Sequence, residues 1–374
     1  MKVAHIICDR YFSEDGTSIT IGGMQSYFTR LAEVLLEEGF RVNLYHIANV
    51  DFEVCHNNIH IKGYKYNKKI KYAPKYLYKL VSKNINQSND IVIFGSEAWI
   101  VKTKGIKSIA IQHGIPWDIP CHYEYGELKY WLYYCYKAFK AFINIKRVNL
   151  LDQIVCVDYN YVNWYRALVA YPKTRLHVIP NFSEILADSY FRKDENIQII
   201  FARRLWQYRG TRIFAYAVQR ILEEYPNVYV TIAGDGPDEG WLKRYFESND
   251  RVSFVCYESN LSLEFHKNMQ IAVVPTIGSE GTSLALLEAM AAKCAVICSN
   301  VGGLTNIIID GYNGMMIPNN DIESLYNAIK YLIENLQVCE LFAERGYETV
   351  ESAFSLSTWK MKWKSVINTI SRDA

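Results

Sequence analysis

The sequence lacks long hydrophobic runs, closely paired cysteines and a strong charge of either sign. No apolar stretch approaches the roughly 20 residues that a membrane-spanning helix needs. Met1 leads directly into a strand-like run that ends at Asp9 and Arg10, so we expect no signal peptide. These absences predict a cytoplasmic protein, or one that lies at the inner face of the cell membrane without crossing it.

The nine cysteines include no C-x-x-C pair. Most of them lie in apolar runs typical of strands, such as those around Cys8, Cys156 and Cys298. Buried thiols in a reducing compartment explain this pattern better than disulfides do. His56 and His60 are spaced like a metal-binding pair on a helix, but no third ligand lies nearby. We therefore predict no metal and no cofactor.

The net charge of +2 is too small to indicate a nucleic-acid-binding protein, but the charge is unevenly distributed. Residues 1–185 contain 23 Lys and Arg against 16 Asp and Glu, and the remainder contains 18 against 23. A basic first half followed by an acidic second half indicates that the first half meets an anionic surface or acceptor.

Short β-branched runs alternate with longer helical runs in both halves of the chain, which predicts an α/β fold with parallel sheets. In the first half, strands are expected at Val3–Cys8 and Arg41–Ile47, with a helix at Gly23–Glu38 between them. In the second half, strands are expected at Val228–Ala233 and Ile271–Val274. The α/β pattern occurs once in each half, so we expect two domains.

The polar, strand-free stretch Asn181–Asn196 is the expected linker. It divides the chain into an acceptor-side domain at 1–182 and a donor-binding domain at 183–354. The remaining segment, 355–374, has a helical pattern with Trp359 and Trp363 on one face. We expect this helix to pack back on the first domain.

The first motif with chemical content follows the strand-like run IAVVP. Glu280 precedes the small residues Gly281, Thr282 and Ser283, which open a helix that contains Glu288. Free N–H groups at such a helix start bind phosphate. At ~1.5 Å per residue the two glutamates are about 10–12 Å apart, too far for a retaining glycosidase, which needs about 5 Å. The spacing suits a diphosphate between two sugars; the alternative is a capped helix with two solvated glutamates.

The second motif is a loop that follows the strand-like run IQIIFA and contains Arg204, Arg209 and Gly210. Loops at the carboxyl ends of parallel strands are where such sheets bind ligands. Fixed guanidinium groups there can stabilise a departing diphosphate, which gains negative charge as its bond breaks. Surface arginines are common, so this motif indicates a diphosphate site only in combination with the first motif.

Together the two motifs resemble those of the GT-B glycosyltransferases, specifically the large retaining glycosyltransferase family 4. Glu280 and Glu288 match the family's glutamate–seven-residue–glutamate signature, and Arg204 to Gly210 match its R-L-x-x-x-K-G loop with Arg209 in the lysine position. Arg203 stands where the family usually has glycine, and Asn306 where it often has glutamate. Other similar segments are Val178–Asn181, Ala233–Pro237, Val301–Gly314, Gly22–Gln25 and Gln112–Gly114.

The resemblance implies two Rossmann-like domains whose parallel sheets face each other across a cleft. It implies a retaining, metal-independent transferase that moves a sugar from a nucleotide-diphosphate-sugar donor to a saccharide or lipid-linked acceptor, in capsular, O-antigen or other cell-envelope polysaccharide synthesis. Catalytic roles are implied for His113, Arg204, Arg209 and Glu280. Donor contacts are implied for Gly22, Gly23, Gly234, Gly281, Thr282, Ser283, Leu284 and Glu288.

A nicotinamide-dependent oxidoreductase is excluded because no G-x-G-x-x-G turn follows Val3–Cys8. A nucleotide-sugar epimerase or phosphorylase with the same fold stays open as an alternative. So does a protein that binds nucleotide sugars without catalysis.

Two stretches of the first half are rich in lysine and aromatic residues, Gly63–Lys83 and Tyr123–Arg147. Alternating Lys and Tyr suits an anionic membrane surface, with rings at the headgroup level and ammonium groups against lipid phosphates. The alternative is an ordinary solvated face. Stacking on single-stranded nucleic acid would use similar residues, but no nucleic-acid-binding signature accompanies them. We therefore expect a membrane surface, and no nucleic acid, as the partner.

Overall fold

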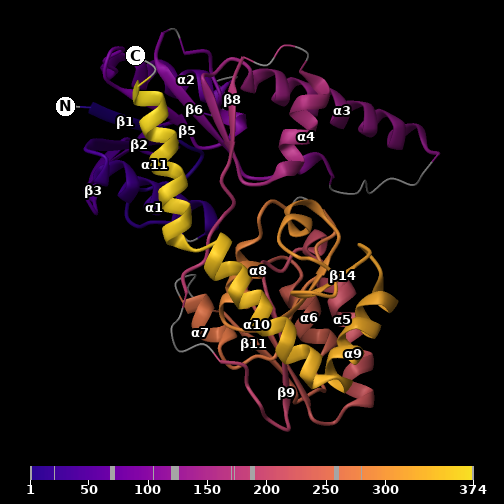
Figure 1. The fold of residues 1–374 in the computed structure, drawn as a ribbon. Coiled ribbons are helices and arrows are strands. Elements are labelled where there is room, and N and C mark those ends of the chain that lie inside the picture. Colours follow the sequence, from indigo (N-terminus) through magenta and orange to yellow (C-terminus); the bar gives the residue numbers. More distant parts are fainter. Residues whose placement is uncertain are drawn as a thin grey trace. The chain divides into compact units, whose positions relative to one another are not determined.

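The computed structural model describes residues 2–20, 22–67, 72–103, 105–118, 126–169, 171, 173–185, 190–256, 261–278 and 280–372. The chain forms two compact units (Figure 1). Unit 1 contains Met1–His113, Tyr123–Pro180 and Trp359–Ala374, and unit 2 contains Gly114–His122 and Asn181–Thr358. Outside the described residues lie 68–71 and 123–125 of the basic stretches, 186–189 of the expected linker, and Asn260, where a helix start was expected.

Unit 1 is built on an eight-stranded sheet in the order β3-β4-β2-β1-β5-β6-β7-β8. All neighbouring strands are parallel except β3 and β4. The central strands are buried on both faces because helices cover both, which is why they are continuous apolar runs. The strands are β1 Lys2–Ile7, β2 Phe40–Ala48, β3 Phe52–His56, β4 Ile59–Lys65, β5 Ile91–Phe94, β6 Lys107–Gln112, β7 Gln153–Cys156 and β8 Arg175–Val178.

The helices of unit 1 are α1 Gly23–Glu37, α2 Ala73–Val81, α3 Leu128–Val148, α4 Tyr159–Leu168 and most of α11 Leu356–Arg372. Helix α1 buries the expected face, including Leu31, Val34 and Leu35. It ends before Gly39, whose φ of +78° favours glycine.

His56 and His60 lie on a β-hairpin, not on a helix. Strands β3 and β4 pair antiparallel, and the turn between them places Asn57 and Asn58 at φ of +47° and +62°. Two consecutive residues at positive φ form the tight turn that suits the twist of a hairpin. The adjacent asparagines are the local sequence signal for this hairpin.

Helix α11 is anchored in unit 1 by two buried tryptophans. The ring of Trp359 lies 5.1 Å from that of Tyr27 in α1, and Trp363 Nε1 donates a hydrogen bond to the Tyr27 hydroxyl at 3.0 Å. Lys360 adds ion pairs to Glu33 and Glu37 of α1, at 3.0 and 3.2 Å. Buried aromatic area therefore holds the end of the chain against α1.

Unit 2 has a six-stranded, fully parallel sheet in the order β11-β10-β9-β12-β13-β14. The strands are β9 Ile197–Ala202, β10 Val228–Ala233, β11 Val252–Val255, β12 Ile271–Val274, β13 Ala295–Ser299 and β14 Met315–Ile317. The helices are α5 Thr211–Glu224, α6 Glu239–Tyr245, α7 Ser262–His266, α8 Leu284–Ala291, α9 Ile322–Glu334 and α10 Leu336–Ala353. The prediction of an α/β fold with two parallel sheets is confirmed.

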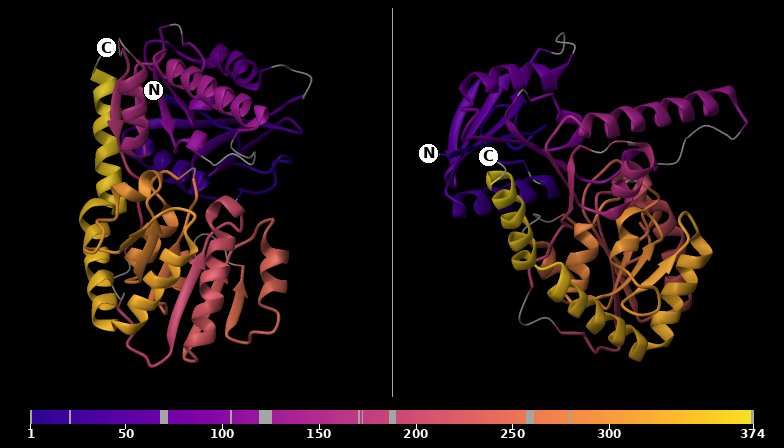
Figure 2. Two further views of the ribbon diagram at one scale, coloured as in Figure 1. Left: turned by 90° about the vertical axis from the view of Figure 1, so that its right-hand side faces the viewer. Right: turned by 45° about the horizontal axis from the view of Figure 1, so that its top comes forward.

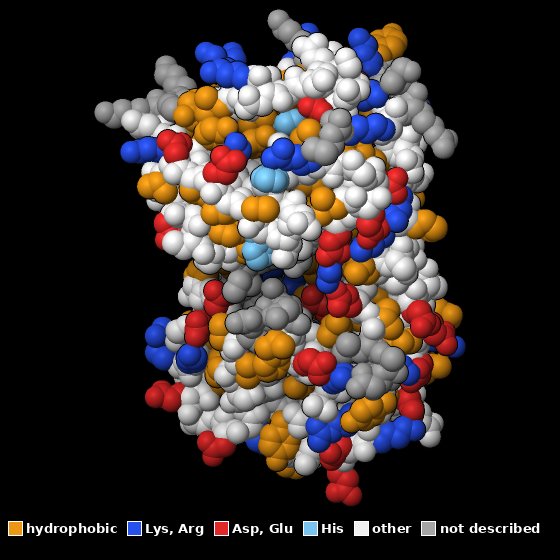
Figure 3. All heavy atoms as spheres, turned by 90° about the vertical axis from the view of Figure 1, so that its left-hand side faces the viewer, with side chains coloured by type: hydrophobic (Ala, Val, Ile, Leu, Met, Phe, Trp, Pro, Cys, Tyr) orange, Lys and Arg blue, Asp and Glu red, His pale blue; other side chains and the backbone are white. Residues whose placement is uncertain are grey.

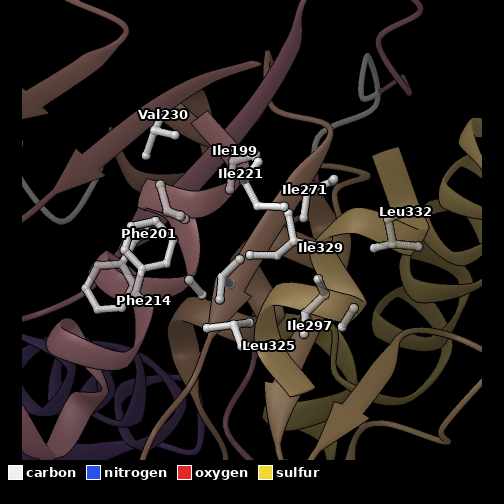
Figure 4. Packing of buried hydrophobic residues seen from close by; sticks show 14 of the residues in the cluster. Ile199, Phe201, Phe214, Ile221, Val230, Ile271, Ile297, Leu325, Ile329 and Leu332 are labelled. Carbon is white, nitrogen blue, oxygen red and sulfur yellow. The ribbon is translucent and has the colours of Figure 1, made fainter. Parts of the chain in front are cut away.

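The main core of unit 2 lies between its sheet and helices α5 and α9 (Figure 4). Phe201 of β9 meets Phe214 of α5 with ring centroids 4.7 Å apart, and Ile329 of α9 is fully buried in the same cluster. This packing fixes β9 and β12, whose ends carry the site described below. Within the described ranges, every helix is too short or too polar to span a bilayer.

We predict that Trp363→Ala destabilises unit 1 by about 3–5 kcal/mol, because a large buried ring and its hydrogen bond are lost together. Urea unfolding followed by circular dichroism measures this. Met361→Ala is the matched control, because Met361 lies exposed on the same helix and its loss should stay within about 0.5 kcal/mol. Equal effects of the two substitutions would contradict the anchoring role of Trp363.

Candidate functional site

The candidate site lies at one edge of the unit 2 sheet. Strands β9 and β12 are parallel neighbours, so the loops that leave their carboxyl ends emerge side by side. Arg203 and Arg209 are in the loop after β9, and Thr276 and Glu280 are in the loop after β12. This is where open parallel sheets bind their ligands.

A single carboxylate oxygen connects the two loops. Glu280 Oε2 accepts hydrogen bonds from Arg203 at 2.5 Å, from Thr276 Oγ1 at 2.9 Å, and from Arg209. Arg203 also donates to Thr276 Oγ1. The Glu280 side chain is only 8% exposed. None of the described residues hydrogen-bonds its other oxygen, Oε1. Glu280 is thus bound to the protein on one side and has one oxygen left for another partner.

The charges of this cluster do not cancel. Burial raises the pKa of Glu280, but the guanidinium groups of Arg203 and Arg209 more than offset this, so the pKa lies below its ordinary value. Burial lowers the pKa of Arg203, while the Glu280 carboxylate opposes that shift, and an arginine stays protonated in proteins. These three residues contain one carboxylate and two guanidiniums, so their summed charge is positive, which favours an anionic ligand.

Arg203, which stands where the family pattern usually has glycine, has a role in the structure that the sequence did not indicate. Its side chain is buried and bonds both Glu280 and Thr276. Gly234, a predicted donor contact, lies against its backbone: a Cβ there would come within 2.1 Å of the Arg203 carbonyl oxygen. Gly234 therefore allows the end of β10 to approach Arg203 closely.

The two arginines predicted to bind the diphosphate have different surroundings. Arg209 contacts Glu280, and its guanidinium carbon lies 5.0 Å from the ring centroid of Tyr208. Arg204 is exposed, and its guanidinium makes no ion pair with a residue in the described part of the chain. The structure thus brings Arg209 and Glu280 together and leaves Arg204 facing solvent.

The segment before α8 is held by close backbone contacts. Gly303 N donates to the Glu280 carbonyl at 3.0 Å, and a Cβ at Gly302 would come within 2.1 Å of that same oxygen. Only glycine fits at Gly302, which also has a φ of +53°. The Val301–Gly314 segment noted in the sequence therefore fixes the backbone at Glu280 and Gly281.

Helix α8 begins at Leu284, with Ser283 as its N-cap. Thr282 and Ser283 are buried, and the Thr282 carbonyl accepts a hydrogen bond from Asn181 at 2.6 Å. No described residue accepts a hydrogen bond from the N–H groups of Ser283, Leu284 or Ala285. These are the unsatisfied donors of a helix start, and they leave α8 able to bind an anion.

Glu288 lies in α8, beyond the helix start. Its Oε2 accepts a hydrogen bond from Ser262 Oγ of α7 at 2.6 Å. Burial raises the pKa of Glu288, and the bond from Ser262 partly opposes that shift. The sequence contained no signal for Ser262 as a partner, because it lies 26 residues away.

The other predicted residues belong to unit 1. Gly22 and Gly23 lie at the start of α1. His113 follows β6; its Nε2 bonds the Gly95 carbonyl at 3.0 Å, and its ring packs edge-on against Tyr27. Burial lowers the pKa of His113 to about 4, so the ring is neutral near pH 7 and Nε2–H is the donor to Gly95. Among the described residues, no group of three or more potential ligands could hold a metal.

Comparison with known proteins covers both units. Residues 21–184 match the family model for Glycosyltransferase Family 4, and residues 196–335 match that for Glycosyl transferases group 1. An uncharacterized glycosyltransferase of Haemophilus influenzae is 21% identical over 358 residues, or 92% of this chain and 96% of that protein. The capsular polysaccharide biosynthesis glycosyltransferase CapM of Staphylococcus aureus is 23% identical over 185 residues, 48% of each chain. The chain spans less than half the length of most of the curated relatives it matches.

Among solved structures, Alr3699/HepE of Anabaena in complex with UDP has the same fold. Its TM-score is 0.72 at 14% identity, and the alignment covers 98% of this chain and 100% of that one.

We predict that Glu280→Gln destabilises unit 2 by about 3–5 kcal/mol at neutral pH, because two guanidiniums, one of them buried, lose their anion. Because the pKa of Glu280 is lowered by folding, its contribution is present above the ordinary carboxyl pKa and is lost as the pH falls through the folded value. The difference between wild type and variant in urea unfolding should therefore shrink on acidification.

The matched control is Glu323→Gln, which breaks an exposed ion pair with Arg220 and should change stability by less than about 1 kcal/mol. A Glu280→Gln effect as small as the control's, or one independent of pH, would show that the cluster does not stabilise the unit.

Proposed function

Because the chain belongs to the group 1, family 4 glycosyltransferases and has the GT-B fold, we propose that it transfers a sugar from a nucleotide-diphosphate-sugar donor with retention of anomeric configuration. The observation that carries the proposal is the Glu280 carboxylate held between Arg203 and Arg209, beside the open N–H groups of α8. This arrangement has a positive charge, helix donors and one unused carboxylate oxygen in one place. All three fit a sugar attached to a diphosphate.

We assign the donor's parts by matching chemistry. The diphosphate lies between the start of α8 and the guanidiniums of Arg204 and Arg209, where cations and N–H groups favour an anion. Glu280 Oε1 accepts a hydrogen bond from a donor-sugar hydroxyl, and Glu288 binds the ribose hydroxyls. The structure of HepE was obtained with UDP, which supports a nucleoside diphosphate as the ligand class.

The chemistry uses the positive field of the site. The bond from the anomeric carbon to the phosphate oxygen breaks, and the bond to the acceptor hydroxyl oxygen forms on the same face of the sugar. The departing diphosphate gains negative charge, which the guanidiniums stabilise, and a phosphate oxygen receives the acceptor's proton. In this scheme no protein nucleophile and no metal is needed. Within unit 1, neutral His113 donates through Nε2–H to the Gly95 carbonyl, which leaves Nδ1 to accept a hydrogen bond from a sugar hydroxyl.

The acceptor is proposed from the relatives and from the charge of unit 1. CapM is named for capsular polysaccharide biosynthesis, so we propose a saccharide or lipid-linked acceptor in the synthesis of a surface polysaccharide. The basic first half fits an anionic membrane surface at the inner face of the cell membrane. Both family models describe glycosyltransferases, so we favour transfer over epimerisation or phosphorolysis.

The proposal is tested first by thermal shift with a panel of nucleoside diphosphates and their sugars. A donor present at 100 times its Kd stabilises the native state by about 2.7 kcal/mol and raises the melting temperature. The product formed with the active donor is then examined by NMR for its anomeric configuration. An inverted product would overturn retention, and the absence of any shift across the panel would overturn the donor class.

We predict that Arg204→Ala and Arg209→Ala each lower kcat about 100–1,000-fold with the identified donor, the range found when one preorganised charge-stabilising donor is removed. Arg220→Ala, which removes an exposed guanidinium of α5, is the control and should leave kcat unchanged. Because Arg209 also contacts Glu280, its loss could reduce stability as well as catalysis. The melting temperature of each variant distinguishes the two effects. Wild-type turnover in Arg204→Ala would remove that residue from the mechanism.

A further inference from the structure

Helix α3 is anchored in unit 1 by its second half only. The residues that it buries are Ala141, Asn144, Ile145 and Val148. No residue between Leu128 and Lys140 is buried. Figure 2 shows this part of the helix extending away from the unit 1 sheet.

A second apolar face runs along the whole helix. Its members follow the three- and four-residue spacing of one helical face, and we call them the α3 stripe: Leu128, Trp131, Leu132, Cys135, Phe139, Phe142 and Ile143. The buried residues have the same spacing but lie on the opposite face. Leu128, Leu132 and Phe139 are 74%, 61% and 65% exposed. The α3 stripe therefore takes no part in the core of unit 1, and exposed apolar patches of this kind mark binding surfaces.

The charges of α3 have one sign. The helix contains five Lys and Arg residues and no Asp or Glu. Lys137 and Lys140 lie over the rings of Tyr133 and Tyr136, at 5.6 and 5.8 Å from their centroids. On the face of the molecule in Figure 3, by contrast, acidic and basic side chains are interspersed. Aromatic rings among lysines, with no acid, are complementary to anionic lipid headgroups.

The α3 stripe leads into a cavity of about 750 Å³ in unit 1. Phe142 and Ile143, the last two members of the stripe, line it together with apolar residues that include Leu168, the last residue of α4, and Val169. Three cations, Lys146, Arg147 and Lys173, line the same cavity, and no acidic residue among the described ones does. An apolar space bordered by cations matches a molecule with an aliphatic chain and a phosphate.

We infer that the cavity holds an aliphatic chain of an anionic phospholipid of the bilayer, with its phosphate against Lys146, Arg147 and Lys173, while the α3 stripe lies in the headgroup region. This rests on the proposed function, in which the enzyme works at the inner face of the cell membrane on a saccharide or lipid-linked acceptor. A second copy of the chain is the less suitable occupant of the stripe, because it would bring the same five cations, which repel each other. An anionic bilayer neutralises them.

Flotation of the full-length chain with vesicles tests the surface. The chain should float with vesicles of phosphatidylcholine and phosphatidylglycerol and stay unbound with phosphatidylcholine alone. Leu132→Glu and Phe139→Glu should each weaken binding about tenfold or more, because an apolar contact is replaced by a repelled charge. Leu341→Glu is the control: Leu341 is 43% exposed on α10 in unit 2, and its substitution should leave binding unchanged.

The cavity is tested separately. Val169→Trp, which fills it, should abolish photo-crosslinking of an acyl-chain-labelled phosphatidylglycerol to α3 and to Leu168, Tyr171 and Lys173, as mapped by mass spectrometry. The double variant Lys146→Gln, Lys173→Gln should bind vesicles about 30-fold more weakly, at roughly 1 kcal/mol per cation. The single variant Lys193→Gln, on unit 2, is its control. Wild-type crosslinking in Val169→Trp would overturn the cavity assignment.

Two further outcomes decide the inference as a whole. No binding to any vesicle would overturn it. So would a concentration-dependent dimer that Leu132→Glu dissociates without any vesicle binding, since the stripe would then belong to a second copy. The donor thermal shift of Leu132→Glu should equal that of wild type. If the chain binds vesicles but no nucleotide sugar raises its melting temperature, the proposed function is refuted and the lipid site is still supported.

Discussion

The unit 2 site depends on one carboxylate that two guanidiniums share. Glu280 Oε2 fixes the loop after β12 to the loop after β9, and Gly302 and Gly303 hold the Glu280 backbone from the other side. Removing one member of this cluster is strongly destabilising, because it leaves a buried charge without its counter-ion. The same contacts set the direction of α8 and its open N–H groups. The stability of unit 2 and the proposed donor site therefore rest on the same atoms, and we expect a substitution here to change both.

Unit 1 shows a different use of charge. His113, which follows β6, is neutral, and its ring contacts the Gly95 carbonyl and Tyr27. At this edge of the sheet the histidine therefore offers a hydrogen-bonding group and no positive charge. Five of the cations of unit 1, and no acidic residue, lie on α3. Arg203 and Arg209 of unit 2, by contrast, pair with a buried carboxylate.

Much of the fold follows from local sequence. The strand Ile271–Val274 is bounded as expected, because it is an apolar run buried on both faces. The hairpin of β3 and β4 was missed because its signal is two asparagines at positive φ, and β14 because it has only three residues. Arg203 was missed for another reason: its partner Glu280 is 77 residues away. Local patterns predict elements, but such pairings depend on which loops the sheet brings together.

Unit 1 is assembled from both ends of the chain. Tyr27 of α1 packs against Trp359 and Trp363, which the ribosome adds only after the whole of unit 2 has been made. During synthesis the first 180 residues therefore emerge with this face of α1 uncovered, whereas unit 2, apart from residues 114–122, is one continuous stretch that precedes Trp359. All residues of unit 2 are therefore synthesised before unit 1 is complete, and α11 supplies the last part of unit 1.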